Sequence, residues 1–189
     1  GPARNPAVRR APAFAGRREA APCGNRELLG LANGGLNPAL RLLVFKTRRK
    51  GWGLRTLEDI PKGTFVCAYA GEVVAASEGL ARERRYHAEG RPVYIMNLHG
   101  TLGKEGGQFY MVDSTEYRNI GALANHTCGA AALEWRKVWG DHLDPRLPAV
   151  GLYAARDVQA GEELEFKYDS CGRNKPDPCY CNHCGWDYH

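Results

Sequence analysis

The quartet Asn125-His126-Thr127-Cys128 gains its meaning from a second stretch about fifty residues downstream, Cys179-Tyr180-Cys181-Asn182-His183-Cys184. Three thiolates within six residues leave a tetrahedral zinc shell one ligand short. Cys128 is well placed in the sequence to supply the fourth ligand. His183 is a rival ligand and Cys171 a weaker one. The pattern predicts a closed, structural zinc site that ties the quartet to the cysteine cluster.

Composition sets the class of protein. The chain has 189 residues, of which 43% are hydrophobic and 25% charged, enough for one substantial core. It contains no run of about 18 apolar residues and no apolar signal segment, so neither a membrane span nor secretion is predicted. Seven cysteines are an odd number, and four of them fit zinc. This favours a reducing compartment over a secreted disulfide framework.

The net charge of +5 is concentrated near the start of the chain. Residues 1–22 hold five arginines and one glutamate, so they account for +4 and leave +1 for the rest. This Pro/Ala/Arg-rich stretch cannot bury enough apolar surface to fold, and we expect a disordered tail. Nonspecific contact with nucleic acid or an acidic partner is one interpretation, and a solvated tail without a partner is the other.

Short apolar runs between glycine-rich turns predict a β-rich fold with one modest helix. The helix is expected over residues 77–89, with Ser77 as its N-cap. Residues 93–98 and 108–112 are expected to form a hairpin. A basic, glycine-rich turn is expected at 48–53. The remaining expected strands are 41–47, 65–69, 133–138, 150–155 and 164–168.

Two segments beside these strands form a weak internal repeat, which we call the echo. Gly53-Leu54 followed by Asp59-Ile60-Pro61-Lys62-Gly63 has the spacing of Gly151-Leu152 followed by Asp157-Val158-Gln159-Ala160-Gly161. Each segment leads into an expected strand. The echo favours two strand-turn-strand units built alike, and chance similarity is the alternative.

Five motifs together resemble the SET-domain protein lysine methyltransferases over about residues 41–186. They are Gly51-Trp52-Gly53-Leu54, Tyr69-Ala70-Gly71-Glu72, Asn125-His126-Thr127-Cys128, Gly161-Glu162-Glu163-Leu164 through Tyr168, and the terminal cysteines. The phrase from Lys50 to Leu57 is similar to the SETMAR-like branch of histone methyltransferases. Cys23-Gly24-Asn25-Arg26 resembles a remnant of the pre-SET region of that branch.

The resemblance implies a β-rich SET-domain fold of several small sheets, with a knot-like C-terminal segment and a post-SET zinc tail. It divides the chain into a disordered tail (1–22), a pre-SET remnant or linker (23–40), a SET domain (41–172) and a post-SET tail (173–189).

The implied activity is S-adenosylmethionine-dependent protein lysine N-methyltransfer to histone tails or similar basic peptides. We expect a nuclear, chromatin-associated monomer without a membrane partner. In-line transfer needs the lysine amine neutral, although its free pKa is about 10.4. A narrow apolar channel and the positive sulfonium both disfavour the ammonium form.

The resemblance also implies the residues of the site. Tyr168 is the expected catalytic tyrosine, Tyr69 lines the same lysine channel, and Phe166 predicts di- or trimethylation because it leaves room where a phenol would hold water. The implied cofactor contacts are Gly51, Trp52, Gly53, Tyr94, Asn125, His126 and Trp186. The implied ligands of one structural Zn²⁺ are Cys128, Cys179, Cys181 and Cys184.

Several positions depart from the family pattern. Ala122 and Leu123 stand where the family usually has an arginine and an aromatic residue, and Ala130-Ala131 replace Pro-Asn. Arg118 replaces a glycine and Ala68 a glutamate. The alternative function is therefore a catalytically weak or inactive SET-like module that binds chromatin or peptides.

Overall fold

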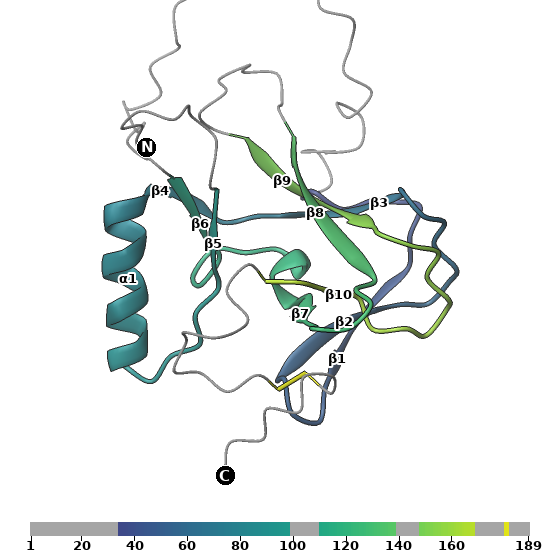
Figure 1. Ribbon diagram of the computed structural model, residues 1–189, viewed down its shortest axis with the longest axis horizontal. Coiled ribbons are helices and arrows are strands. Elements are labelled where there is room, and N and C mark those ends of the chain that lie inside the picture. Colours follow the sequence, from purple (N-terminus) through teal and green to yellow (C-terminus); the bar gives the residue numbers. More distant parts are fainter. Residues whose placement is uncertain (1–33, 99–109, 139–147, 169–179, 182–189) are drawn as a thin grey trace, which may run out of the picture.

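The computed structural model describes residues 34–98, 110–138, 148–168 and 180–181. Figure 1 shows its elements in chain order. They are β1 (Leu42–Lys46), β2 (Trp52–Thr56), β3 (Phe65–Tyr69), β4 (Glu72–Ala75), α1 (Ala76–Ala88), β5 (Ile95–Asn97), β6 (Tyr110–Asp113), η2 (Ile120–Leu123), β7 (Asn125–His126), β8 (Leu133–Val138), β9 (Ala149–Ala154) and β10 (Glu165–Phe166).

The strands form four small sheets. Two are three-stranded and antiparallel, in the orders β3-β9-β8 and β4-β6-β5. The β1–β2 hairpin is antiparallel, whereas β7 and β10 pair in parallel. Helix α1 packs against β4, β5 and β6 at one side of the molecule, opposite the β1–β2 hairpin (Figure 1). The expected β-rich fold of several small sheets with one helix is confirmed.

The expected N-cap of α1 is wrong. The cap residue is Ala75, with extended backbone and no side-chain cap, and Ser77 lies inside the helix. Strand β4 runs directly into α1 at this point, so the sheet fixes where the helix begins. Glu78 in the first turn supplies the negative charge that a helix N-terminus favours.

The expected hairpin near residue 100 is confirmed, with shorter strands. β5 and β6 pair antiparallel with Ile95 opposite Asp113, and β6 also pairs with β4. The connecting loop lies outside the described residues. The strand expected over 164–168 is also shorter, because only Glu165–Phe166 forms β10. No helix in the described part of the chain has the length and apolar character needed to cross a bilayer.

The two echoed segments pair with each other. Ile60 and Val158 exchange both backbone hydrogen bonds, at 2.8 and 2.9 Å. Asp157 Oδ1 accepts from the Lys62 N–H and Asp59 Oδ1 accepts from the Ala160 N–H, both at 2.8 Å. We call this near-symmetric pair of segments, residues 59–63 and 157–161, the clasp. Its symmetry explains the equal spacing seen in the sequence.

Each half of the clasp ends in a glycine with positive φ, and this conformation gives a stability prediction. Gly63 has φ +82° and Gly161 has φ +89°. A Cβ at either position meets no atom within 4 Å, so only backbone strain opposes alanine. We expect Gly63→Ala and Gly161→Ala to destabilise the fold by roughly 1 kcal/mol each, lowering Tm by about 2–4 °C. Calorimetry checks this, with exposed Lys62→Ala as the control; two unchanged Tm values would contradict it.

Candidate active site

Strand β7 brings the Asn125-His126 pair beside Tyr168. β7 pairs in parallel with Glu165–Phe166, about forty residues later in the chain. Two positions beyond Phe166, the Tyr168 N–H donates to His126 Nδ1 at 2.9 Å. The expected cofactor pair and the expected catalytic tyrosine are therefore neighbours in space.

The Tyr168 phenol is fixed by three neighbours. Its hydroxyl donates to the Ala124 carbonyl oxygen at 2.9 Å. Its ring centroid lies 4.8 Å from that of Phe166 and 5.1 Å from that of His126. The hydroxyl oxygen keeps its lone pairs, so it remains able to accept a hydrogen bond from a substrate.

Tyr69 and Tyr94 lie near enough to Tyr168 to influence its pKa. The Tyr69 hydroxyl donates to the Tyr94 carbonyl oxygen at 3.2 Å. Burial raises the pKa of Tyr69 to about 12. Burial also raises the pKa of Tyr168, and nearby Tyr69 and Tyr94 raise it further. Although 38% of the Tyr168 surface is exposed, its hydroxyl end is therefore poorly hydrated. Both phenols stay protonated at neutral pH and act as hydrogen-bonding groups, not as bases.

The glycine-rich turn after β1 packs against Asn125. Asn125 Nδ2 donates to the Trp52 carbonyl oxygen at 3.1 Å and to Glu163 Oε1 at 3.0 Å. A Cβ on Gly53 would lie 2.7 Å from Thr47 Cγ2 and 3.1 Å from Asn125 Nδ2. Only glycine allows this close approach. Trp52 itself is 53% exposed, so its ring is available to a ligand.

Lys50 belongs to this site, and sequence analysis did not select it. Its ammonium contacts Glu163 at 2.9 Å and also contacts Glu165. Burial alone would lower the pKa of Lys50, but hydrogen bonds and charges from Glu165 and Glu163 outweigh burial and raise it. Lys50 therefore ties the turn before Trp52 to the strand that carries Phe166. The alternation of 163–168 was the available signal, because it puts both glutamates on one polar face.

Three potential metal ligands gather next to Tyr168. The ligand atoms of His126, Cys128 and Cys181 all lie within 4.8 Å of one another. A tetrahedral zinc with Zn–S bonds of about 2.3 Å needs its sulfurs about 3.8 Å apart, so this spacing fits. Cys179, Cys184 and Trp186 lie outside the described residues, as do the rival ligands His183 and Cys171.

His126 is better suited to support this group than to ligate the metal. Its Nδ1 accepts the Tyr168 N–H, so the neutral ring carries its proton on Nε2. Nε2 lies 3.1 Å from Cys128 Sγ and can donate to that sulfur. Burial lowers the pKa of His126, and Lys50 and Lys167 lower it further, which favours the neutral ring. An N–H donor to a ligating thiolate is a common outer-shell contact in metal sites.

Two of the departures noted in the sequence, Ala122 and Arg118, are accommodated in the turn before Asn125. Ala122 is 2% exposed and packs in the core within η2. Asn119 caps this short helix by accepting from the Gly121 N–H at 3.1 Å. Arg118 places its guanidinium 4.7 Å from the Tyr94 ring centroid. The turn is thus held by Asn119 without the family arginine.

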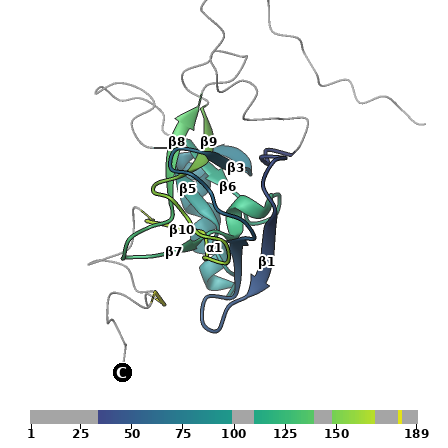
Figure 2. The same cartoon turned by 90° about the vertical axis from the view of Figure 1, so that its right-hand side faces the viewer.

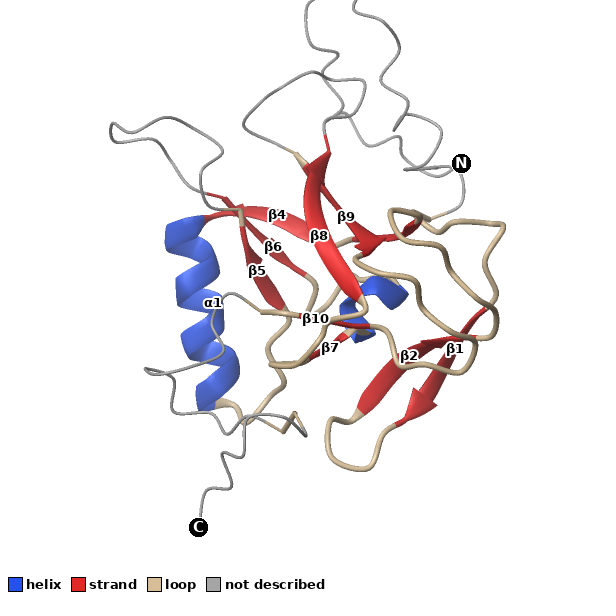
Figure 3. Ribbon diagram, turned by 45° about the vertical axis from the view of Figure 1, so that its right-hand side comes forward, coloured by secondary structure: helices blue, strands red, loops and turns tan. Residues whose placement is uncertain are grey.

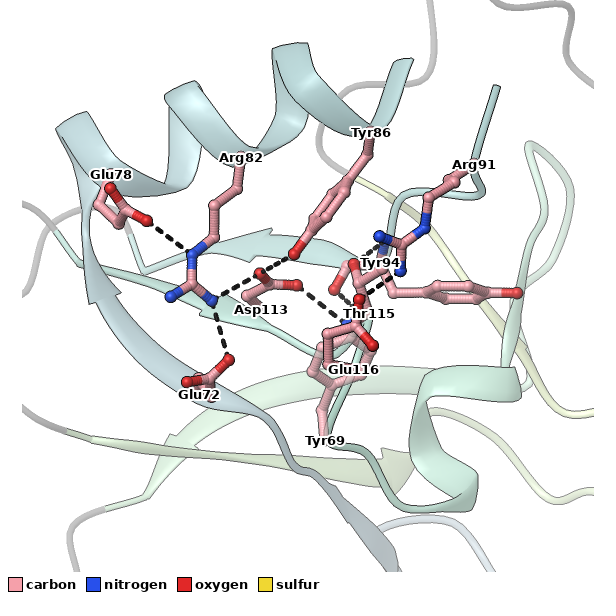
Figure 4. A network of polar contacts seen from close by, with 10 residues as sticks. All are labelled: Tyr69, Glu72, Glu78, Arg82, Tyr86, Arg91, Tyr94, Asp113, Thr115 and Glu116. Atoms are coloured by element: carbon pink, nitrogen blue, oxygen red, sulfur yellow. Dashed lines mark hydrogen bonds and ion pairs between the residues drawn. The ribbon is translucent and has the colours of Figure 1, made fainter. Parts of the chain in front are cut away.

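A buried carboxylate links α1 to the tyrosines (Figure 4). The Asp113 side chain is fully buried and accepts from Arg82 at 3.1 Å and from the Tyr86 hydroxyl at 3.0 Å. Burial would raise the pKa of Asp113, but hydrogen bonds from Thr115, Arg82 and Tyr86 outweigh it and lower the pKa. Asp113 is therefore a charged anchor in the core.

The link continues from Asp113 to the Tyr69 hydroxyl. Asp113 Oδ1 accepts from the Thr115 N–H at 2.9 Å, and Thr115 Oγ1 accepts from the Tyr94 N–H at 3.3 Å. The Tyr94 carbonyl then accepts from Tyr69, as Figure 4 allows the reader to follow. No local motif marks this network, because its members come from segments that lie far apart in the sequence.

Small sheets around a parallel β7–β10 pair, with tyrosines and cysteines meeting there, define a SET domain. The chain belongs to the SET domain family, which matches residues 51–169. Rat "Histone-lysine N-methyltransferase SETMAR" is 40% identical over 159 residues, covering 74% of this chain and 47% of SETMAR. The expected resemblance to SETMAR-like proteins is confirmed.

Other relatives carry similar names. Human "Histone-lysine N-methyltransferase EHMT1" is 37% identical over 68% of this chain and 9% of its own length. Xenopus tropicalis "Histone-lysine N-methyltransferase SUV39H2" is 37% identical over 71% of this chain and 32% of its own length. The chain spans about half the length of rat SETMAR and smaller shares of these two relatives.

Lys50→Met should weaken cofactor affinity, because it leaves Glu163 and Glu165 uncompensated behind the glycine-rich turn. Loss of a charged hydrogen-bond partner predicts roughly tenfold weaker binding of S-adenosylhomocysteine by calorimetry. Exposed Lys62→Met is the control. Adding Glu165→Met to Lys50→Met should restore part of the affinity, and unchanged binding in Lys50→Met would contradict the assignment.

Asp113→Asn should destabilise the fold, because the buried amide must direct its NH2 donor either at the Thr115 N–H or at the Arg82 and Tyr86 donors. We expect a loss of about 2–3 kcal/mol in denaturant unfolding. Glu116→Gln is a matched control, since Glu116 pairs with Arg91 at the surface and this substitution should destabilise the fold much less. Equal effects of the two substitutions would contradict an anchoring role for Asp113.

Proposed function

We propose that the chain is an S-adenosylmethionine-dependent protein lysine N-methyltransferase acting on histone tails or similar basic peptides. The supporting observation is the meeting of Asn125-His126, Tyr168 and Tyr69 beside the glycine-rich turn. Membership of the SET domain family and the names of the relatives agree with this proposal.

The geometry of the turn supports the proposed cofactor contacts Gly51, Trp52 and Gly53. Gly53 is closely packed against Thr47 and Asn125, Gly51 has a positive φ with open space beside it, and the exposed Trp52 ring can cover a ligand. Both N–H bonds of the Asn125 amide are used by Trp52 and Glu163. Asn125 can therefore contact a ligand only through Oδ1, which accepts hydrogen bonds. This suits the ammonium on the amino-acid part of the cofactor. Tyr94 and His126 complete the set, and Trp186 remains a prediction.

The cofactor would supply an electrophilic methyl group, and the protein residues would orient the lysine amine. The hydroxyls of Tyr168 and Tyr69 donate to backbone carbonyls, and Tyr69 also hydrogen-bonds with Ser114. Each phenol oxygen has two lone pairs, so each keeps at least one that can accept from the amine. Their poorly hydrated surroundings favour the neutral amine over the ammonium. Neither tyrosine needs to act as a base, so the proton leaves the amine to water before the transfer.

We further propose one structural Zn²⁺ held by Cys128, Cys179, Cys181 and Cys184, with His126 donating to Cys128. The described thiols lie at a spacing that suits a tetrahedral shell. We also propose that domain boundaries follow residues 22, 40 and 172. The protein is further proposed to be a monomer located in the nucleus on chromatin. The alternative is a weak or inactive module that binds chromatin or peptides.

Tyr168→Phe distinguishes the two functions. The substitution removes the hydroxyl and its bond to Ala124 but keeps the ring contacts with Phe166 and His126. We expect kcat on histone peptides to fall by roughly 100-fold or more, with S-adenosylhomocysteine affinity nearly unchanged. A wild-type protein that binds this cofactor product but never transfers a methyl group would support the inactive alternative.

Phe166→Tyr tests the expected degree of methylation. Phe166 is buried and its ring lies against Tyr168, where a new hydroxyl could hold a water molecule. We expect mass spectrometry of peptide products to shift from di- or trimethyl-lysine toward monomethyl-lysine. A variant that still gives mainly higher methylation states contradicts the role assigned to Phe166.

A further inference from the structure

The positive charge of the folded part is concentrated in the β1–β2 hairpin. The segment from residue 41 to 57 holds six arginine or lysine residues and no acidic residue, and the next acid is Glu58. Everything from Cys23 onward has a net charge of only about +1. The hairpin is therefore a local cationic surface on a nearly neutral body. Its turn projects at the edge of the molecule, away from α1 (Figure 3).

Acidic side chains neutralise little of this charge. Lys50 is paired with Glu163 and Glu165, and Arg41 approaches Glu58 at 3.9 Å. Lys46 and Arg55 instead lie over aromatic rings, those of Trp52 and Phe45. Arg48 and Arg49, at the turn, are exposed, and within the described ranges no carboxylate forms an ion pair with either.

Five of the six cations line one concave surface. A cleft of about 540 Å³ lies beside the hairpin, and among the described residues Glu163 is the one acidic residue in its wall. The cleft shares Lys50 and Glu163 with the candidate site, whereas Gly51, Trp52, Gly53, Tyr94, Asn125 and His126 are not among its lining residues. Its lining residues are Phe45, Lys46, Thr47, Arg48, Arg49, Lys50, Arg55, Glu163 and Tyr180.

The turn is held by its own hydrogen bonds. Thr47 donates to the Gly51 carbonyl through both its N–H, at 2.8 Å, and its hydroxyl, at 2.9 Å. The Lys50 N–H donates back to Thr47 Oγ1 at 2.8 Å. Arg48 and Arg49 thus extend from a fixed backbone, so a partner need not order the turn on binding.

We propose that this cationic hairpin surface binds the phosphate backbone of duplex DNA. Arginine forks match phosphate oxygens, and successive phosphates along a duplex suit a row of cations without deep apolar pockets. Exposed Tyr180 at the cleft can add a hydroxyl donor to the same backbone. No recognition helix accompanies the hairpin in the described part of the chain, so we expect affinity without base-sequence preference. Such a surface would hold the domain on chromatin, independently of methyl transfer.

Salt dependence gives the proposal a quantitative form. Each neutralised phosphate contributes about −0.9 to the slope of log K against log salt. Loss of the contacts made by Arg48 and Arg49 should therefore reduce the slope by about 2. Affinity for DNA should fall by at least about tenfold near 0.1 M salt, with no change in S-adenosylhomocysteine binding.

The test is fluorescence anisotropy of a labelled short duplex, titrated with full-chain variants between about 50 and 200 mM salt. Arg48→Glu/Arg49→Glu is compared with Arg84→Glu/Arg85→Glu, which makes the same charge change on exposed positions of α1. The proposal expects the hairpin variant to lose affinity and slope, and the helix variant to lose much less. Equal loss in both variants, or loss in neither, overturns it.

Two further arms identify the source of binding. Each variant is also made with the five arginines of residues 1–22 replaced by alanine. The proposal fails if these alanine substitutions abolish DNA binding while the hairpin substitutions leave it unchanged, because the tail is then responsible. An acidic peptide and vesicles containing anionic lipid replace DNA in parallel titrations. Stronger hairpin-dependent binding to either than to DNA also overturns the proposal. Binding of S-adenosylhomocysteine by each variant confirms that the variant is folded. Neither this measurement nor DNA binding depends on methyl transfer, so a failed DNA-binding proposal can be told apart from a failed proposal of enzyme activity.

Discussion

The hydrogen bond from the Tyr168 N–H to His126 Nδ1 is the contact on which the rest of the site depends. It extends the two-residue parallel pair of β7 and β10 by a side-chain acceptor. Because Nδ1 is used in this way, the proton of the neutral ring lies on Nε2, which faces Cys128 Sγ. One imidazole ring therefore connects the tyrosine, the strand pair and the cysteine group.

The β1–β2 hairpin has two sides with different chemistry. Its inner side carries the glycine-rich turn and is joined to β10 through Lys50 and to β7 through Asn125. Its outer side carries Arg48 and Arg49, with which no described carboxylate forms an ion pair. Figure 2, turned by a right angle from Figure 1, shows β1 along one side of the body with its turn at the lower end. One short hairpin thus supports both the proposed cofactor contacts and the proposed DNA contacts.

Much of the fold could be predicted from the sequence because its signals are local. Short apolar runs between glycine-rich turns predict most of the strands, and the echoed segments are the two halves of a clasp around Ile60 and Val158. The cap at Ser77 was wrong because a preceding strand, and not a side chain, fixes where α1 begins. Local rules do not include that tertiary constraint.

The candidate site was predicted only in part. Tyr168, Asn125-His126 and Cys128 do meet, but the motif gave no reason to place His126 against the Cys128 sulfur. Lys50 and Asp113 were missed because their partners lie far away in the chain, and a charge is informative only once its neighbours are known. Cys179, Cys184 and Trp186 remain predictions.

A metal held at Cys128 is proposed to support the cofactor site through His126. This is tested by the S-adenosylhomocysteine affinity of the purified protein, with zinc quantified, before and after removal of the metal by a chelator and again after zinc is returned. We expect about one zinc per chain, a marked loss of affinity on removal and recovery on return. A folded, metal-free protein that binds this cofactor product as tightly as the zinc-loaded protein would contradict it.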